Sequence, residues 1–338
     1  MMNAPQRALF FAIVLALIAA ATDAVAQSAK RNGASQEQEQ KPEVEIPTLP
    51  QNIEPSLEDA FAAYQRGFYQ TAFKAAAARV DKNPKDGAAM TLLGELYAQG
   101  FGVRQDLIMA AAWYRRAADL GDMNAALALG MMHLQGRGVA TDKKRGLELL
   151  AQAADKGHPA AAYNLALVLL GSGSTTDQEH AATILQRAAD ADLGEAQYAL
   201  AVLYKEGHGV ARDMNRAATL LKKASDHQVV AAQVEYAIML FNGDTIGRDE
   251  EAAAKLFARA AGKGNAIAQN RLARLLVAGR GVRKDMVEAA SWHLAASRQG
   301  LTDSWLDEAL KSLSDEERRK AQELAELRGA SGDSVMKP

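Results

Sequence analysis

One pattern occurs six times in this sequence, at intervals of 35 or 36 residues. Each copy has a glycine that opens a turn, an aspartate shortly after it, and an alanine further along. The aspartates mark the register: Asp106, Asp142, Asp177, Asp213, Asp249 and Asp285. Such a period is typical of solenoids, in which each supersecondary unit buries its apolar face only by stacking on its neighbours. We therefore expect function to lie on an extended surface and not in a single catalytic pocket.

Each copy reads as two helices joined by a glycine turn. In the first copy, apolar residues recur at helical spacing over residues 88–99, which predicts a helix with one buried face. Gly100 and Gly102 permit positive φ and end that helix, and Asp106 is placed to cap the next one. The second helix is predicted over residues 107–120. Helix-on-helix packing is the expected architecture.

These residues resemble the Sel-1-like repeat family, relatives of tetratricopeptide repeats with a longer glycine-containing turn. The resemblance rests on Leu93-Gly94-Glu95-Leu96-Tyr97, Gly100-Phe101-Gly102-Val103, Asp106 and Trp113-Tyr114-Arg115-Arg116-Ala117-Ala118. It covers roughly two-thirds of the chain, residues 87–300, where repetition makes it specific. It implies an all-α fold, a right-handed α-solenoid of stacked helix-turn-helix repeats. Altered turns are expected in the third copy, which is one residue short, and in the fifth, which lacks the second glycine.

The ends of the array differ from its middle. Residues 56–86 have the glycine, aromatic, alanine and proline spacing of one tetratricopeptide unit, and we interpret them as an N-terminal capping helix pair. Residues 301–327 are interpreted as C-terminal capping helices, because a capping-box sequence at Ser314 precedes a charged amphipathic helix. The apolar stripe of that helix is expected to be Ala321, Leu324 and Leu327. Residues 328–338 are predicted to be a disordered tail.

The first 26 residues have the pattern of a secretory signal peptide. Arg7 precedes an apolar run over residues 8–21, and Ala24-Val25-Ala26 is a small-x-small cleavage site. The run is shorter than the roughly 20 residues that a membrane-spanning helix needs, so we expect no stable membrane insertion after cleavage. The sequence has no cysteine, which excludes a lipid-modified cysteine anchor and disulfides. These features predict a periplasmic protein, with secretion as the minor alternative.

Residues 27–55 are rich in Gln, Glu, Lys, Ser and Pro. They cannot bury enough apolar surface to offset the chain entropy of folding, so we predict a disordered linker. The formal net charge of the sequence is -2, and signal cleavage removes one charge of each sign. That balance argues against a nucleic-acid partner, whose phosphates require a basic face.

Several local patterns resemble ligand-binding motifs without their context. Gly-x-Gly recurs with the repeat, but no strand precedes it and both the third Rossmann glycine and the P-loop Gly-Lys-Ser/Thr are missing. The six histidines have no metal-ligand spacing, and capping explains the repeated aspartate. We therefore expect no enzyme activity, no cofactor and no metal site.

The remaining candidate is the surface formed by the first helix of each repeat. In the related tetratricopeptide arrays this helix lines the concave wall, and the register transfers that geometry to thirteen partner-binding candidates. They are Thr91, Glu95, Leu127, Met131, Tyr163, Leu167, Tyr198, Val202, Val234, Ile238, Phe241, Asn270 and Arg274. An extended peptide or an amphipathic helix would bury apolar side chains along this stripe. About half of the candidates are expected to face the groove, and the others to pack against a neighbouring helix.

We expect an exported protein–protein interaction scaffold, an adaptor or regulator of envelope processes or signalling that binds a protein or peptide on this surface. The resemblance supports that class, because bacterial members of the family commonly act as scaffolds and signalling modulators. The alternative is binding of a cell-wall or other glycan fragment, with exposed tyrosines as stacking faces. An envelope hydrolase of β-lactamase type ranks third: some family members have been linked to β-lactam binding, but Ser-x-x-Lys with its partner motifs is missing.

Overall fold

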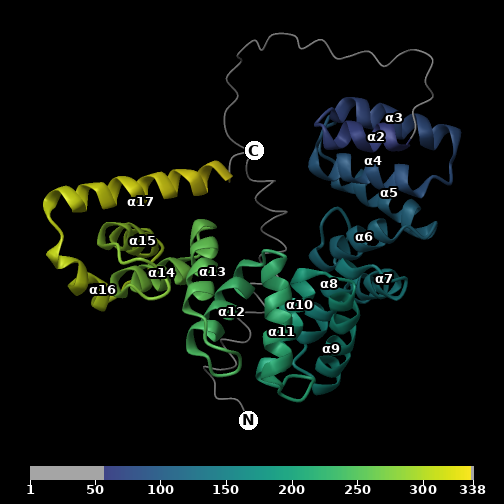
Figure 1. The fold of residues 1–338 in the computed structure, drawn as a ribbon. Helices are drawn as coiled ribbons and strands as arrows, with labels where there is room; N and C mark the ends of the chain where they lie inside the picture. Colours follow the sequence, from purple (N-terminus) through teal and green to yellow (C-terminus); the bar gives the residue numbers. More distant parts are fainter. Residues whose placement is uncertain (1–56, 336–338) are drawn as a thin grey trace, which may run out of the picture. The chain divides into compact units, whose positions relative to one another are not determined.

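The computed structural model describes residues 57–335 of the 338-residue chain. These residues form sixteen α-helices, α2 to α17, and one short 3-10 helix, with no strand in the described range. The described chain divides into two compact units, residues 57–187 and 188–335, and the boundary falls near the end of α9. Figure 1 shows the helices in chain order.

The first unit is a stack of consecutive helix pairs. From α2 to α8, each helix contacts the next one along the chain, and α4 also contacts α2 and α6. We call the first helix of each repeat helix A (α4, α6 and α8 in this unit) and the second helix B (α5, α7 and α9). The elements are α2 (Leu57–Gln65), α3 (Tyr69–Lys82), α4 (Gly87–Gln99), α5 (Leu107–Asp119), α6 (Met123–Gln135), α7 (Lys143–Asp155), α8 (Pro159–Leu170) and α9 (Thr175–Asp190).

The second unit repeats this construction. Helices A are α10, α12 and α14, helices B are α11, α13 and α15, and each contacts the next one along the chain. The prediction of an all-α solenoid of stacked helix-turn-helix repeats is confirmed in both units. The elements are α10 (Gly194–Glu206), α11 (Met214–Asp226), α12 (Val230–Asn242), α13 (Glu250–Gly262), α14 (Ala266–Ala278), α15 (Met286–Arg298), α16 (Ser304–Ala309), η1 (Leu310–Ser312) and α17 (Asp315–Val335).

The repeated aspartate caps helix B in five of the six repeats. The Asp142 carboxylate accepts a hydrogen bond from the Arg145 backbone N–H at 2.9 Å, which satisfies a donor that the helix leaves free. Its own N–H donates to the His133 carbonyl at 2.9 Å and closes the turn onto helix A. Both bonds recur at Asp106, Asp213, Asp249 and Asp285. The fifth turn therefore keeps this closure although it lacks the second glycine.

The third turn is built differently, as its shorter sequence predicts. Helix α9 begins at Thr175, so Asp177 lies inside its first turn and not before it. The Ser174 hydroxyl accepts from the Asp177 N–H at 3.4 Å, and Asp177 accepts from the Ser172 hydroxyl at 2.6 Å. The prediction that the repeated aspartate caps helix B is thus wrong in this repeat. Loss of one residue starts the helix earlier, and Ser174 takes over the capping position.

The second glycine of the turn sets the spacing between repeats. Gly138 has φ of 68°, and a Cβ built on it would lie 2.2 Å from the carbonyl oxygen of Leu107, the first residue of the preceding helix B. A Cβ on Gly281 would lie 2.0 Å from the carbonyl oxygen of Glu250, the first residue of α13. These oxygens belong to the backbone and cannot rotate away. Glycine is therefore required here for close approach as well as for its backbone angle.

The C-terminal helices cover the last repeat. Helix α16 contacts α14, and α17 contacts α15. Ser314 and Glu317 form the predicted capping box: the Glu317 carboxylate accepts from the Ser314 N–H at 2.8 Å, and the Ser314 hydroxyl accepts from the Glu317 N–H at 3.3 Å. The predicted apolar stripe is wrong at Leu327, whose exposed fraction is 64%, because Ala325 takes the buried place beside Ala321.

Helix α17 also extends further than predicted. It runs to Val335, so the chain is helical past Leu327, where the tail was expected to begin. No proline interrupts the backbone hydrogen bonds before Pro338. The predicted signal peptide (1–26), the predicted linker (27–55) and residues 336–338 of the predicted tail lie outside the described part of the chain. None of the helices in residues 57–335 combines the length and the apolar composition that a membrane crossing requires.

Candidate functional site

The structure separates the thirteen predicted binding residues into two groups. Six are buried among neighbouring helices: Tyr163, Leu167, Tyr198, Val202, Val234 and Asn270. The other seven are half-buried: Thr91, Glu95, Leu127, Met131, Ile238, Phe241 and Arg274. The buried group dominates the middle of the stripe and the half-buried group lies toward its ends. Whether any of the thirteen contacts a partner remains a prediction.

One cavity in the second unit gathers three of the half-buried candidates. Ile238 and Phe241 on α12 and Arg274 on α14 line a hollow of about 360 Å³. We call it the α12–α14 cavity. Its other lining residues are Asn242, Phe257, Arg271, Leu275, Ala278, Arg280 and Trp305.

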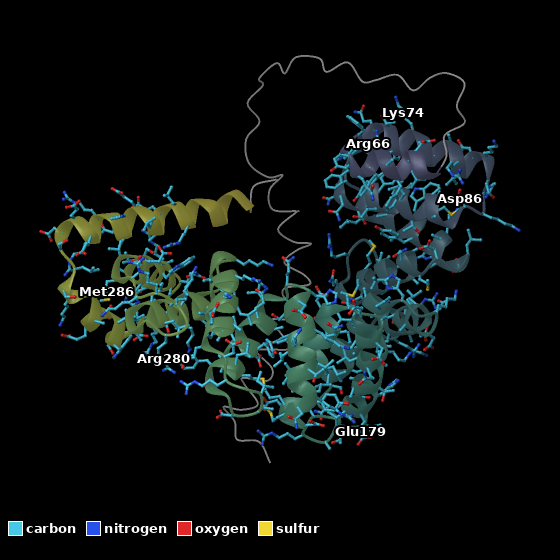
Figure 2. The ribbon with its side chains drawn as sticks, in the orientation of Figure 1. Arg66, Lys74, Asp86, Glu179, Arg280 and Met286 are labelled. Atoms are coloured by element: carbon cyan, nitrogen blue, oxygen red, sulfur yellow. The ribbon has the colours of Figure 1, made fainter. Side chains whose placement is uncertain are left out.

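Arginine side chains lie over the aromatic rings of this cavity. The Arg280 guanidinium carbon is 4.2 Å from the Phe241 ring centroid, and that of Arg274 is 5.1 Å from the Trp305 centroid. Arg280, labelled in Figure 2, follows the end of α14. Contacts at these distances are favourable because the face of an aromatic ring carries partial negative charge. They hold the guanidinium groups at the cavity wall.

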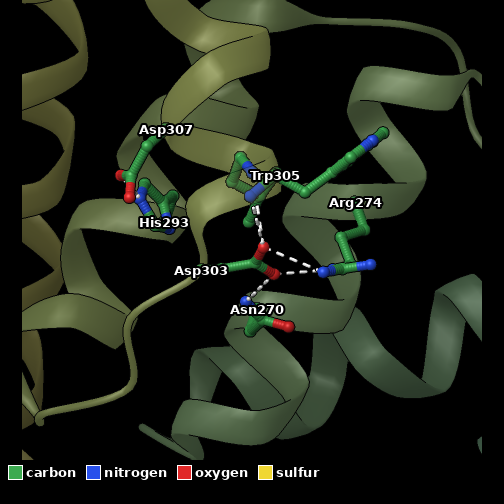
Figure 3. A network of polar contacts seen from close by, with 7 residues as sticks. Asn270, Arg274, His293, Asp303, Trp305 and Asp307 are labelled. Carbon is green, nitrogen blue, oxygen red and sulfur yellow. Dashed lines mark hydrogen bonds and ion pairs between the residues drawn. The ribbon is translucent and has the colours of Figure 1, made fainter.

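Asp303 holds Arg274, one of the residues that line the cavity (Figure 3). As N-cap of α16, its carboxylate accepts from the backbone N–H groups of Trp305 at 3.1 Å and Leu306 at 3.3 Å. The same carboxylate accepts from Arg274 Nε at 2.6 Å and Nη2 at 2.8 Å, and from Asn270 Nδ2 at 2.7 Å. The Arg274 hydrogen bond is the main reason that the pKa of Asp303 lies well below its usual value. Asn270, predicted as a binding residue, thus orients Asp303 from within the core.

A second carboxylate holds the opposite arginine. Glu250, the first residue of α13, accepts from Arg280 Nε at 3.1 Å and Nη2 at 2.7 Å, and also pairs with Arg248. Hydrogen bonding from Arg280 lowers the pKa of Glu250 to about 2, so this carboxylate is ionised at neutral pH. Paired and stacked in this way, Arg274 and Arg280 have fixed positions before any partner arrives.

The helix-A face of the first unit also has hollows. Glu95, Leu127 and Met131 line one of about 390 Å³, and Thr91 and Glu95 line another of about 640 Å³ beside Phe61. Glu95 accepts a hydrogen bond from the Tyr114 hydroxyl at 2.8 Å. Burial, reinforced by the Glu95 charge, raises the pKa of Tyr114, so this phenol stays protonated at neutral pH.

Sequence reasoning missed a second set of caps. Asp86, Asp122, His158 and Asn265 precede helices A and accept from backbone N–H groups in their first turns. The sequence signal for these caps was a polar residue directly before the start of each of these four helices. Among the histidines, the ring of His158 caps α8, and His293 Nε2 lies 2.7 Å from Asp307. Among the described residues no three His, Asp or Glu side chains could hold a metal together.

Stacked helix pairs with a glycine turn and hollows on the helix-A face define a helical-repeat protein of the interaction-scaffold class. The family model described as Sel1 repeat matches residues 87–122, 124–158, 159–193, 194–229, 230–265 and 266–301. This chain belongs to the Sel1 repeat family, as its sequence predicts. Sel1 repeat proteins generally act as scaffolds for protein–protein interactions, and their fold is typically non-catalytic.

Solved structures agree on the fold. A Sel1 repeat protein from Oxalobacter formigenes is 29% identical, with 72% of this chain and 100% of that chain covered and a TM-score of 0.65. The protein c5321, a protective antigen present in uropathogenic Escherichia coli strains and displaying an SLR fold, is 23% identical. That match covers 83% of this chain and 70% of that chain, with a TM-score of 0.51, and it shows the fold alone. No curated protein matches the chain.

Proposed function

We propose that this chain is an exported scaffold that binds a protein or peptide partner on its helix-A face, as a periplasmic adaptor or regulator of envelope processes or signalling. The family supports the binding class, and the signal-peptide pattern of residues 1–26 supports export. The observation that carries the proposal is the α12–α14 cavity. There Trp305, with an exposed fraction of 46%, and the half-buried Phe241 line an open hollow.

The helix-A face suits a partner because it is already ordered. Asp303 and Glu250 fix the arginines, the caps fix the helix ends, and buried alanines such as Ala253 and Ala273 fix the distance between helices. Binding of a partner therefore loses little free energy to ordering of the site. Exposed aromatic rings contribute a disproportionate share of the binding free energy at such interfaces.

Two cell experiments test the proposal. N-terminal sequencing of the protein from a periplasmic fraction is expected to begin at Gln27, and an intact Met1 chain in membranes would contradict export.

Chemical crosslinking of the mature chain in living cells, followed by mass spectrometry, is expected to yield a specific partner. Phe241→Ala is expected to weaken its capture, since an aromatic hot spot is worth about 2 kcal/mol or more. Ile108→Ala, an exposed apolar residue on a helix B, is the control and should leave capture unchanged.

The glycan alternative requires exposed tyrosines as stacking faces, and the tyrosines of the helix-A stripe do not favour it. Tyr163 and Tyr198 have exposed fractions of only 8% and 6%, so neither offers an open ring face for a sugar. Competition between a captured partner and cell-wall fragments distinguishes the two ligand classes, and β-lactam turnover by the pure protein tests the hydrolase alternative.

A further inference from the structure

We propose that the α12–α14 cavity is a carboxylate-recognition site. Its occupant is an extended segment of a partner protein in which an acidic side chain lies next to a large apolar one. This inference rests on the proposed function and adds the chemistry of the partner to it.

The first argument is the balance of charge around the cavity. Arg271, Arg274 and Arg280 line it, and Arg248 pairs with Glu250 at its edge. Among the described residues, Glu250 and Asp303 are the carboxylates that pair with these guanidinium groups. The cavity therefore has a local excess of positive charge, although the whole chain has a formal net charge of -2. A local excess of this kind attracts an anionic partner and orients its approach.

The second argument is the number of hydrogen-bond donors left over. Arg274 and Arg280 each use Nε and Nη2 on their carboxylates, and Nη1 of each donates to no atom of the described residues. Arg271 is exposed, and its guanidinium has no ion-pair or hydrogen-bond partner in the described part of the chain. Guanidinium N–H groups match a carboxylate in both geometry and charge. An incoming carboxylate requires donors with no partner, and those of Arg274 and Arg280 are also fixed in position.

The third argument is the apolar part of the wall. Ile238, Phe241, Leu275 and Trp305 line the same hollow as the arginines. At about 360 Å³ it has room for one or two side chains and not for a folded domain. The combination selects a segment that presents an apolar side chain and a carboxylate together.

A phosphoryl group is the competing anion, because it carries about two negative charges at neutral pH and the excess positive charge of the cavity attracts it as well. The phosphoserine array described next separates a phosphorylated segment from one with Asp or Glu.

The test uses the mature full chain and arrays of short synthetic peptides. One array carries Glu next to Phe or Leu, and matched arrays carry Gln, Lys or phosphoserine in place of Glu. We expect the chain to bind the Glu array best, and to bind it less at high ionic strength. Arg271→Gln and Trp305→Ala are each expected to weaken this binding about tenfold or more, the usual effect of losing a hydrogen bond to a charged group or an aromatic anchor. Arg259→Gln, an exposed arginine on α13 outside the cavity, should change nothing.

Several results would overturn the inference. Equal binding of the Gln array, stronger binding of the phosphoserine array, or full binding by Arg271→Gln would each exclude carboxylate recognition at this cavity. Partner crosslinks in cells that survive Arg271→Gln would then leave the proposed function standing without the inference. Selective Glu-peptide binding with no crosslinked partner in cells would support the site and contradict the function.

The chain's own residues 43–46, Glu-Val-Glu-Ile, have similar chemistry. If Glu45→Gln strengthens binding of the Glu array, that segment competes for the cavity, and the site is occupied by its own chain and not by a partner.

Discussion

Asp142 shows what single residues contribute to this fold. Its carboxylate caps α7 and its backbone N–H closes the turn onto α6, so one residue fixes both helices of a repeat. Asp177 occupies the same sequence register without capping, because α9 begins before it. Two identical residues at equivalent sequence positions thus have different structural roles, which makes them a matched pair.

We expect Asp142→Ala to destabilise the protein by about 0.5 to 2 kcal/mol, the usual loss for a helix N-cap. Asp177→Ala should cost less, because Ser174 remains as the cap. Thermal melts of the two purified variants measure the difference. An unchanged melting temperature for Asp142→Ala together with lost partner binding would instead make the repeated aspartate a ligand residue.

A glycine pair tests the spacing between repeats. Gly138→Ala places a Cβ against the Leu107 backbone, whereas Gly157→Ala meets open space at a similarly positive φ of 89°. In both variants the alanine at positive φ lowers stability by about 1 to 2 kcal/mol. In Gly138→Ala the new Cβ also displaces the backbone of the preceding helix B. Urea unfolding should therefore show a larger loss for Gly138→Ala. Equal losses would show that backbone angle alone explains the second glycine.

For single residues, the sequence predicts helix caps well and contacts between repeats poorly. The caps at Asp106 and Asp142 follow from spacing, because a cap involves only its own helix. The contact of Gly138 with Leu107 was not predicted, because it depends on how closely one repeat packs on the previous one.

Helices A differ along the chain in how much of each face they leave open. In α10, Tyr198 is buried and its hydroxyl donates to Glu235 at 2.9 Å. In α12, Phe241 is half-buried and faces arginines. The register identifies the face of each helix, but not whether the next element covers it. The candidate site was therefore predicted as a stripe, whereas the structure has hollows toward the ends of that stripe.

Two truncations separate core from surface on these helices. Tyr198→Ala is expected to cost about 3 to 5 kcal/mol of stability, as for a buried aromatic residue. Phe241→Ala should cost less, because part of its ring is already exposed, and should instead weaken partner capture. Circular dichroism melts with pull-downs check both. If Phe241→Ala melts as low as Tyr198→Ala, Phe241 belongs to the core and the cavity is not a binding surface.

The contact between α14 and α16 is expected to depend on pH. The pKa of Asp303 is lowered in the folded protein from an unfolded value of about 3.9, so its charge stabilises the fold above that value. This contribution is lost as pH falls from about 4 through the folded-state pKa. Asp303→Asn keeps a good N-cap but lacks the charge.

We therefore expect the wild type to be more stable than Asp303→Asn at pH 7, with the gap narrowing below about pH 4. Urea unfolding of both proteins at pH 7 and at pH 3 measures this difference in the free energy of unfolding. A gap that stays constant would mean that the Asp303 charge contributes nothing to the pairing with Arg274. No sequence signal predicted this pairing, because Asp303 lies outside the repeat register and meets α14 only in the folded chain.

At the scale of the whole molecule, repetition explains why the fold was easier to predict than the site. Six copies of one pattern determine helix type, order and turn, and each repeat contacts mainly its neighbours, so local predictions add up to the architecture. Binding has no such repetition. Phe241, Arg271 and Trp305 each occur at one position of one repeat or cap, and only the packing of α12, α14 and α16 brings them together.

The central claim is that partners bind the helix-A face. The most direct measurement places a photo-crosslinking amino acid at Asn242 and Gln135, exposed residues that line helix-A hollows, and at Ala258 and Ala112, exposed residues on helices B. After illumination of living cells, the account predicts partner adducts from Asn242, Gln135 or both, and none from Ala258 or Ala112. Adducts that form only from Ala258 or Ala112 would contradict it.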